Sequence, residues 1–233
     1  MAATDTVLWC VVPAAGHSTR VGGDTPKQYL PIAGKPLLLH TLERLAAHPR
    51  IAGLMVVLAA DDRCWPGSSQ LQGKPVRTTV GGKERADSVL AGLAALRADV
   101  IDEHFILVHD AARPCIGASD ISRLLDLGIA AGGGLLAAPL RDTLKRADVR
   151  NRVAATEPRE SRWRALTPQL FRYGELVQAL QAARTACIAV TDEAMAMEHA
   201  GHRPLLIEGA ESNIKVTTPP DFALAEFLLT RII

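Results

Sequence analysis

The chain alternates short runs of β-branched and other apolar residues with longer amphipathic stretches, and this alternation limits the possible folds most strongly. It is typical of βαβ units, in which helices connect the parallel strands of a sheet. We therefore predict an α/β fold with a mostly parallel sheet. The expected strands are 7–12, 54–59, 77–80, 105–109, 134–138 and 204–207. The expected helices are 36–47, 84–98, 120–131, 173–184, 191–200 and 219–233.

One polar, charge-rich stretch, 141–163, breaks this alternation and has no helical face. We interpret it as an extended hairpin arm, at about 139–163, that projects from a single domain spanning residues 1–233. A two-stranded ribbon is only marginally stable unless something packs on it, so a disordered loop is the alternative.

Charge and composition limit the partners. Lys and Arg number 26 and Asp and Glu 25, so the formal net charge is +1, which gives no global field for nucleic acid or an anionic membrane. We expect neither partner, and any polyanion site must be local. The four cysteines are scattered without metal or redox spacing, and the N-terminus carries no export signal, so we expect a cytoplasmic protein with reduced thiols.

The loop after the first strand, PAAGHSTRVGGDTPKQYL, is the first candidate binding site. In open α/β sheets, ligands bind beyond the carboxyl ends of the strands. Small residues at 14–16 allow close approach to backbone N–H groups, and Arg20 and Lys27 add two cations, a combination that suits a phosphate chain. The alternative is a pair of ordinary solvated cations. The loop contains neither GxxxxGK[ST] nor GxGxxG, which argues against a P-loop and a dinucleotide site.

Two further loops follow predicted strands. In GGKERADSV, Gly81 and Gly82 could line a nucleobase with backbone groups, although an ordinary glycine turn before a helix explains the same pattern. In VHDAARP, Asp110 ends a strand beside small residues, where a carboxylate can bind Mg²⁺ while phosphates supply the other oxygens. A surface ion pair with Arg113 is the alternative there.

Later segments allow structural explanations. Thr191 is expected to cap its helix, with Asp192 and Glu193 in the first turn. Lys215 stands in a short β-type run, where it could reach a phosphate or protect a sheet edge. No arrangement of His with Cys or Ser points to a covalent nucleophile.

Taken in order, PAAGHSTR, PKQYL, GGKERADSV, VHDAARP, APLRDT, ALTPQ, TDEA and NIKVT extend over essentially the whole chain. This set resembles the 2-C-methyl-D-erythritol 4-phosphate cytidylyltransferases of non-mevalonate isoprenoid biosynthesis. PAAG and PKQ are typical of sugar nucleotidyltransferases generally, whereas HDAARP together with GGxxRxxSV is much narrower. The resemblance implies a Rossmann-like nucleotidyltransferase fold and transfer of CMP from CTP to 2-C-methyl-D-erythritol 4-phosphate, with release of pyrophosphate and a requirement for Mg²⁺.

The resemblance also implies residue roles. The catalytic positions are Arg20, Lys27, Arg159 and Lys215. The nucleotide-binding positions are Ala14, Ala15, Gly16, Gly82, Ser88 and Ala111. The positions that bind the sugar phosphate are Arg113, Thr143, Thr167 and Thr191, and the metal position is Asp110. The family exchanges its arm between two subunits, so the resemblance also implies a homodimer in which a threonine of the arm completes the partner's site.

These roles agree with the chemistry. A phosphate monoester has a second pKa of about 6, so the attacking group is already largely anionic near neutral pH and needs no general base. The task is to bring two polyanions together, which calls for cations and positioning.

The chain departs from the family at Ser18, where a glycine is usual, and at Lys83, where an acid is common. Three alternatives stay open: a cytidylyltransferase for a pentitol phosphate, a non-catalytic nucleotide-binding protein, and an NAD-dependent oxidoreductase.

Overall fold

A mostly parallel sheet forms the centre of the protein in a computed structural model that describes residues 8–16 and 25–231. Within those residues the sheet has eight strands, in the order β12-β8-β11-β7-β1-β4-β6-β5. The strands of the sheet are β1 (Leu8–Pro13), β4 (Ile51–Leu58), β5 (Gln70–Leu71), β6 (Lys74–Val80), β7 (Phe105–Val108), β8 (Gly133–Pro139), β11 (Trp163–Arg172) and β12 (Leu205–Glu208). The helices are α1 (Leu37–Ala47), α2 (Arg85–Ala95), α3 (Ala118–Ala131), α4 (Tyr173–Thr185), α5 (Glu193–His199) and α6 (Pro219–Arg231).

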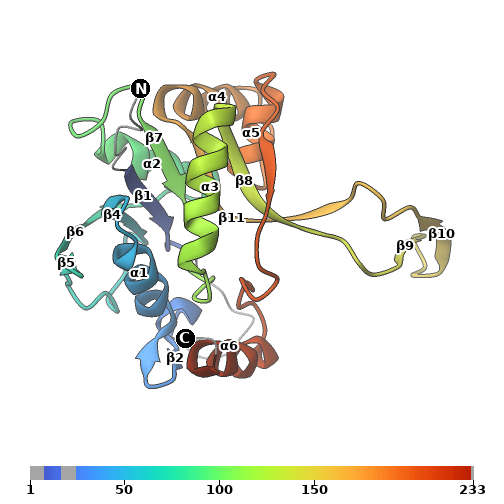
Figure 1. Cartoon of the computed structure of the whole chain (residues 1–233), viewed down its shortest axis with the longest axis horizontal. Helices are drawn as coiled ribbons and strands as arrows, with labels where there is room; N and C mark the ends of the chain where they lie inside the picture. The colour runs from blue at the N-terminus through green and yellow to red at the C-terminus, as the bar shows by residue number, and fades with distance from the viewer. Residues whose placement is uncertain (1–7, 17–24, 232–233) are drawn as a thin grey trace.

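The predicted α/β class with a mostly parallel sheet is confirmed (Figure 1). Strand β1 lies parallel to both β4 and β7, and β4 lies parallel to β6. The carboxyl ends of β1, β6 and β7 therefore point to the same edge of the sheet. Loops that are distant in sequence meet there.

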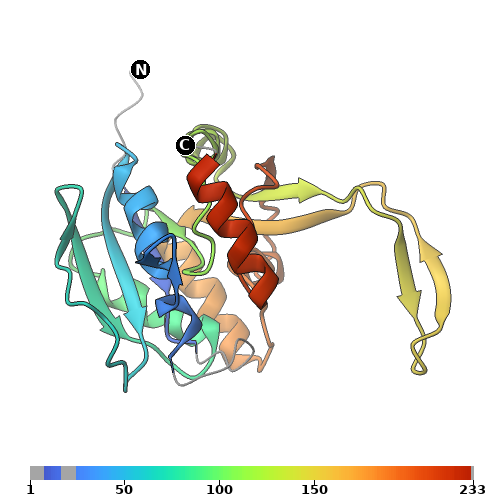
Figure 2. The ribbon, with the colours of Figure 1, turned by 90° about the horizontal axis from the view of Figure 1, so that it is seen from below.

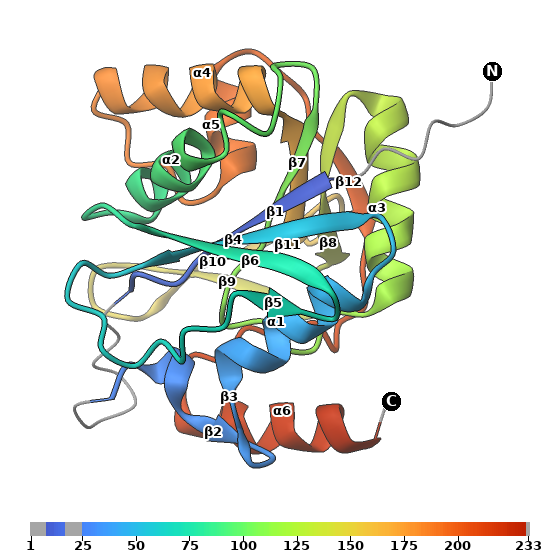
Figure 3. The ribbon, with the colours of Figure 1, turned by 90° about the vertical axis from the view of Figure 1, so that its left-hand side faces the viewer.

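Helices cover both faces of the sheet because its central strands are apolar on both sides. In β1, Cys10 and Val12 belong to the apolar cluster that includes α1 and α3, whereas Val11 belongs to the cluster that includes α2, α4 and α5. Figure 3 shows α2, α4 and α5 above the sheet and α1 below it. Helix α6 packs through Ala225 and Leu229 in a third cluster with Ile32, which lies in the small β2–β3 ribbon (Pro31–Ile32 and Lys35–Pro36).

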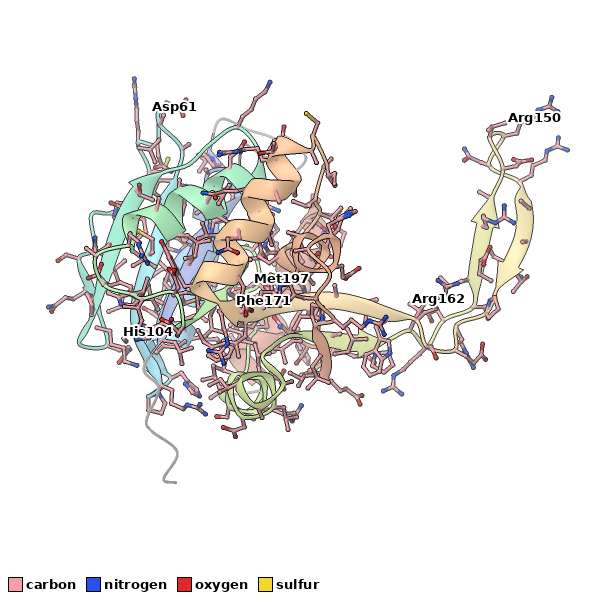
Figure 4. All side chains as sticks on the ribbon, turned by 90° about the horizontal axis from the view of Figure 1, so that it is seen from above. Asp61, His104, Arg150, Arg162, Phe171 and Met197 are labelled. Carbon is pink, nitrogen blue, oxygen red and sulfur yellow. The ribbon has the colours of Figure 1, made fainter. Side chains whose placement is uncertain are left out.

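The polar stretch forms the predicted hairpin arm and not a disordered loop. Strands β9 (Leu144–Ala147) and β10 (Val153–Glu157) pair in antiparallel fashion, separate from the main sheet. Figure 2 shows the arm extending far from the helices and the sheet. In Figure 4, Arg150 lies at the far end of the arm and Arg162 at its root, while Phe171 and Met197 lie inside the body.

The sequence prediction missed β11, which occupies a central place in the sheet. This strand runs antiparallel to both neighbours, β7 and β8. Pro168 obscures it, because proline cannot donate a hydrogen bond to a strand ladder. The protein accommodates Pro168 at a register shift between Ala165 and Gln169, and pairing with β7 involves only residues from Gln169 onward.

Three smaller predictions were also wrong. Helix α2 ends at Ala95 and not at residue 98. Helix α5 begins after Asp192, whose side chain accepts a hydrogen bond from the Met195 N–H, so Asp192 and not Thr191 is its N-cap. Lys215 lies in an irregular segment between β12 and α6 and not in a strand.

Along residues 8–16 and 25–231, no helix is long and apolar enough to cross a membrane.

Candidate active site

A cavity of about 220 Å³ opens at the carboxyl ends of β1, β6 and β7. It is bounded by the three predicted loops together with the short 3₁₀ helix η1 (Lys27–Tyr29) and the segment before α6. The cavity brings together nine of the predicted site residues: Ala14, Ala15, Gly16, Lys27, Gly82, Ser88, Asp110, Ala111 and Lys215. The remaining lining residues are Pro13, Gln28, Lys83, Glu84, Arg85 and Ala112. Arg20 and Ser18 lie outside the described residues.

The helix η1 fixes the first loop through hydrogen bonds from the Gln28 side chain. The buried Gln28 side chain donates from Nε2 to the carbonyl oxygen of Ala14 at 2.8 Å and to that of Gly16 at 3.4 Å. Its neighbour Lys27 donates from Nζ to the carbonyl oxygen of Val216 at 2.9 Å. Lys27 is therefore a fixed cation at the cavity wall and not an ordinary solvated one.

The second loop packs so closely on the first that glycine is required at its start. A Cβ added at Gly81 would lie 2.7 Å from the Ala15 Cβ and 2.7 Å from the Ser88 Oγ. Real Cβ atoms do not approach other heavy atoms this closely, so a side chain would push the two loops apart. Helix α2 then begins with a capping box formed by Glu84 and Asp87, which satisfies its first N–H groups.

Asp110 is the centre of charge in the cavity. Its Oδ1 accepts hydrogen bonds from Arg85 Nη2 at 3.0 Å and Nε at 3.2 Å, and its Oδ2 lies 2.8 Å from Lys215 Nζ. Arg113 Nε lies farther away, 3.7 Å from Oδ2. Burial by itself would raise the pKa of the Asp110 carboxyl, but the charges of Arg85 and Lys215 outweigh burial and hold that pKa well below its usual range. Asp110 is thus a buried carboxylate with three cations around it, and not the exposed partner of Arg113 alone.

A hydrogen-bond chain fixes the backbone of Asp110. Burial lowers the pKa of His109 to about 4, so its ring is neutral and has one donor and one acceptor nitrogen. Its Nε2 lies 3.1 Å from the carbonyl oxygen of Arg113, which can only accept, so Nδ1 accepts from the Thr167 hydroxyl at 3.0 Å. The same Thr167 oxygen accepts from the Asp110 N–H at 3.0 Å. Thr167 therefore supports the carboxylate from behind the cavity wall.

The segment before α6 joins this chain. Asn213 donates from Nδ2 to the carbonyl oxygen of Thr167 at 2.7 Å, and Arg113 donates from Nη1 to the carbonyl oxygen of Asn213 at 2.8 Å. Two buried polar atoms in the described part of the chain are without a hydrogen-bond partner, and both belong to this group: Arg113 Nε and Asn213 Oδ1. Both atoms are buried, so neither is presented to a ligand in this conformation.

Sequence reasoning missed two residues of the site, Arg85 and Glu193. The guanidinium of Arg85 forms a two-pronged ion pair with Glu193, with Nη1–Oε1 at 2.5 Å and Nη2–Oε2 at 3.1 Å. Glu193 is 0% exposed. The only signal for them was their place in the motifs GGKERADSV and TDEA, which gave no indication that they pair.

Five of the predicted site residues that the structure describes do not line the cavity within this chain: Arg113, Thr143, Arg159, Thr167 and Thr191. Arg113 and Thr167 are buried beside Asp110, whereas the other three lie elsewhere. Thr143 precedes β9 on the arm, and Arg159 follows β10; both are exposed. The Arg159 guanidinium donates to the carbonyl oxygen of Arg141. Thr191 is exposed beside the start of α5, with its N–H 3.4 Å from the Met195 Sδ. At the root of the arm, Glu211 pairs with Arg141 at 2.7 Å and with Arg164 at 3.3 Å.

A divalent cation is compatible with this donor set. Among the described residues, no group of three or more His, Cys, Asp or Glu side chains could hold a metal ion. Mg²⁺ in nucleotide enzymes is bound through one or two carboxylates, with phosphates and waters supplying the other oxygens. Asp110 fits this arrangement because it is ionised, lines the cavity and already holds a cation, the Lys215 ammonium, at Oδ2.

The chain is similar to known proteins over nearly its whole length. A protein-family model described as "IspD: 2-C-methyl-D-erythritol 4-phosphate cytidylyltransferase" matches residues 8–231. A protein of that name from Stenotrophomonas maltophilia (strain R551-3) is 57% identical over 225 residues, which cover 96% of this chain and 97% of the relative. A relative of the same name from Xanthomonas euvesicatoria pv. vesicatoria is 56% identical over 223 residues, covering 95% of this chain and 84% of the relative.

Solved structures resemble the whole fold. A crystal structure of 4-diphosphocytidyl-2C-methyl-D-erythritol synthase superimposes with a TM-score of 0.82 at 37% identity, covering 96% of this chain and 98% of the other. The 2-C-methyl-D-erythritol 4-phosphate cytidylyltransferase of Francisella tularensis gives a TM-score of 0.82 at 31% identity, covering 95% and 99%. The chain therefore belongs to the 2-C-methyl-D-erythritol 4-phosphate cytidylyltransferase family.

Proposed function

We propose that the protein transfers CMP from CTP to 2-C-methyl-D-erythritol 4-phosphate, in the biosynthesis of isoprenoid precursors. A phosphate oxygen of the acceptor forms a bond to the α-phosphorus of CTP, the bond from that phosphorus to the β-phosphate breaks, and pyrophosphate leaves. The product is 4-diphosphocytidyl-2-C-methyl-D-erythritol. The observation that carries the proposal is one cavity lined by close-packed small residues on one side and by Lys27, Lys215 and Asp110 on the other.

The small residues suit the nucleotide. Backbone groups of the first and second loops are accessible because the side chains there are short or absent, so they can bind the base, ribose and phosphates without aromatic stacking. The residues assigned to this role are Ala14, Ala15, Gly16, Gly82, Ser88 and Ala111.

The cations serve the transfer step. Lys27 is fixed at the cavity wall by its bond to Val216, and family resemblance adds Arg20 as a second cation on the triphosphate. Such preorganised charges stabilise the negative charge that develops around the α-phosphorus. Lys215 and Arg113, both beside Asp110, are assigned to the acceptor phosphate.

Asp110 would hold Mg²⁺ together with the triphosphate. When bound, Mg²⁺ neutralises phosphate charge and orients the leaving pyrophosphate. Thr167 keeps the Asp110 backbone in place for this role.

The acceptor side is completed across a homodimer. Thr143 and Arg159 lie on or beside the arm and not at the cavity of their own chain, and the arm carries the exposed apolar residues Val149 and Val153. A hairpin of this kind gains stability when it packs on a second subunit.

A cytoplasmic location is supported by the exposed free thiols of Cys64 and Cys187.

The deciding experiment is an assay of pyrophosphate release with Mg²⁺ and CTP, comparing 2-C-methyl-D-erythritol 4-phosphate, ribitol 5-phosphate and no acceptor. Release only with the first acceptor is expected. Release only with ribitol 5-phosphate would keep the chemistry and replace the substrate. Absence of release with every acceptor would overturn the enzymatic assignment in favour of nucleotide binding alone.

A further inference from the structure

We infer that Glu193 is a positioning residue that confines Arg85 to the Oδ1 oxygen of Asp110, so that the guanidinium fork stays off Oδ2, the oxygen that the metal would take over from Lys215. The inference rests on the proposed role of Asp110 in holding Mg²⁺. It concerns a buried acid that is outside the cavity lining, and it assigns to Arg85 the function of an orienting clamp.

The geometry of Arg85 is the first step. Its two terminal nitrogens face Glu193, with Nη1 at 2.5 Å from Oε1 and Nη2 at 3.1 Å from Oε2. Only the side edge of the guanidinium, Nε and Nη2, reaches Asp110, and both contacts are made to the same oxygen, Oδ1. Oδ2 is left to Lys215.

The charges explain why both acids are needed. An arginine guanidinium has five N–H donors in a fixed fork and pairs most strongly with one carboxylate through two parallel bonds. With Glu193 present, that two-pronged pair is satisfied outside the cavity. Without the Glu193 charge, Asp110 would be the carboxylate nearest to Arg85, and the fork could turn onto both of its oxygens. The guanidinium would then join Lys215 at Oδ2, and Mg²⁺ would have to displace both cations to bind there.

Glu193 is itself firmly placed. Gln169 of β11 accepts from the Ala194 N–H at 2.8 Å and donates to Asp192 Oδ2 at 2.9 Å, so both chain neighbours of Glu193 are bonded to one side chain. Gln169 pairs in register with Val108, the last residue of β7. The start of α5 and the loop that carries Asp110 are therefore both anchored to the paired strands β7 and β11.

The test measures how much Mg²⁺ strengthens CTP binding, in the absence of the acceptor. Isothermal titration calorimetry gives the Kd of CTP with excess EDTA and with excess Mg²⁺, and the ratio of the two is the gain due to the metal. Substitutions of groups that orient metal ligands commonly cost 10–100-fold in metal affinity, so we expect Glu193→Gln to reduce this gain by about tenfold or more. The measured quantity is the ratio, so any change in metal-free CTP affinity caused by the lost charge beside Arg85, which lines the cavity, is divided out. A residue with only a structural role would change both affinities together and leave their ratio unaltered.

Two variants make the result decisive. Glu198→Gln removes an exposed acid from the same helix and should leave the gain unchanged. Asp110→Asn should abolish the gain. If Glu193→Gln does not fold, Glu193→Asp, which keeps the charge but is one methylene too short to hold the fork where it now lies, should show a loss in the same direction.

The outcomes separate the inference from the function on which it rests. Loss of the gain in Glu193→Gln (or Glu193→Asp) and Asp110→Asn, but not in Glu198→Gln, supports the clamp. A gain that persists in Glu193→Gln, or in Glu193→Asp as its substitute, while Asp110→Asn loses it overturns the clamp and leaves the metal assignment intact. A gain that persists in Asp110→Asn overturns the metal assignment, and the clamp with it.

Discussion

At the scale of single residues, the site has an excess of cations over acids. Asp110 and Glu193 are surrounded by Arg85, Arg113 and Lys215, so the cluster has one positive charge more than it has negative charges. Burial lowers the pKa of Arg113, and the charge of Asp110 opposes that effect. An incoming phosphate can therefore replace solvent around Lys215, whose side chain is 43% exposed, whereas the desolvation of the buried Arg113 is already met in folding.

The two residues with the clearest electrostatic roles should have large effects. We expect Lys27→Ala and Asp110→Ala each to lower turnover by at least about a hundredfold, the scale of losing one preorganised charged group. Steady-state pyrophosphate release measures this, with Lys35→Ala as the control because Lys35 pairs with Glu43 outside the cavity. Nearly normal rates in both variants would be incompatible with the site.

Arg159 should affect only one substrate. Because Arg159 is exposed beside the arm and does not line the nucleotide cavity, Arg159→Ala should raise the KM for the sugar phosphate at least about tenfold and leave the Kd of CTP unchanged. Arg150→Ala, at the far end of the arm, removes the same charge and serves as the control. Equal weakening of CTP binding in calorimetry would contradict this division.

A histidine far from the cavity should make the fold sensitive to acid. His48 is buried against Ser122. The pKa of its ring is lowered from the ordinary 6.5, mainly by burial and to a smaller extent by the charges of Lys74 and Arg50. Just below pH 6.5 the unfolded chain therefore binds a proton at this position that the folded chain does not, so stability falls as pH falls. The contribution of His48 is at most about 1.4 kcal/mol per pH unit.

Urea unfolding of wild type and His48→Gln at about pH 7.5 and about pH 5.5 checks this linkage. The variant should lose less stability between the two pH values than wild type does. His202→Gln, at an exposed histidine, should behave like wild type. An identical loss in wild type and His48→Gln would exclude the contribution of His48.

At the scale of elements, periodic patterns predicted the parallel strands and the helices well, since each buries a regular face. They failed where pairing is decided by distant partners. Strand β11 contains Pro168 and follows a charged arm, so nothing local marks it as central, and only pairing with β7 and β8 makes it a strand. The Arg85–Glu193 ion pair was missed for the same reason, because 108 residues separate its partners. The loops around Ala14, Gly82 and Asp110 could be predicted because each follows its own strand.

Close packing of α2 on the sheet gives an element-scale prediction. A Cβ added at Gly92 would lie 2.6 Å from Val11 Cγ1 and 2.9 Å from Val57 Cγ2. Alanine normally stabilises a helix by about 1 kcal/mol relative to glycine, yet overpacking costs about 1–3 kcal/mol, so Gly92→Ala should lower the free energy of unfolding. Denaturant titration measures it, and a gain in stability would show that α2 can move outward at no cost.

At the scale of the whole molecule, the proposed homodimer predicts which chain supplies Thr143. Thr143→Ala and Lys27→Ala chains should each be nearly inactive alone. If the arm serves the partner's site, a heterodimer of the two variants contains one site with both native residues. Mixing equal amounts under exchange conditions should therefore restore about a quarter of wild-type activity.

The same mixture distinguishes the opposite arrangement. If Thr143 served its own chain, every site in the heterodimer would still lack one residue, and mixing would restore nothing. Light scattering supplies the assembly state, with the single chain at 24.9 kDa as the reference mass.

The position of β11 also has an evolutionary consequence. Its outer residues, Trp163 to Ala165, pair with the end of β8 at the root of the arm, whereas its inner residues Thr167 and Gln169 support Asp110 and the start of α5. In the proposed homodimer, this strand would therefore serve assembly at one end and catalysis at the other. A mutation that shifts its register would alter both traits at once, so natural selection on the proposed subunit contact and on the proposed active site would act on the same ten residues.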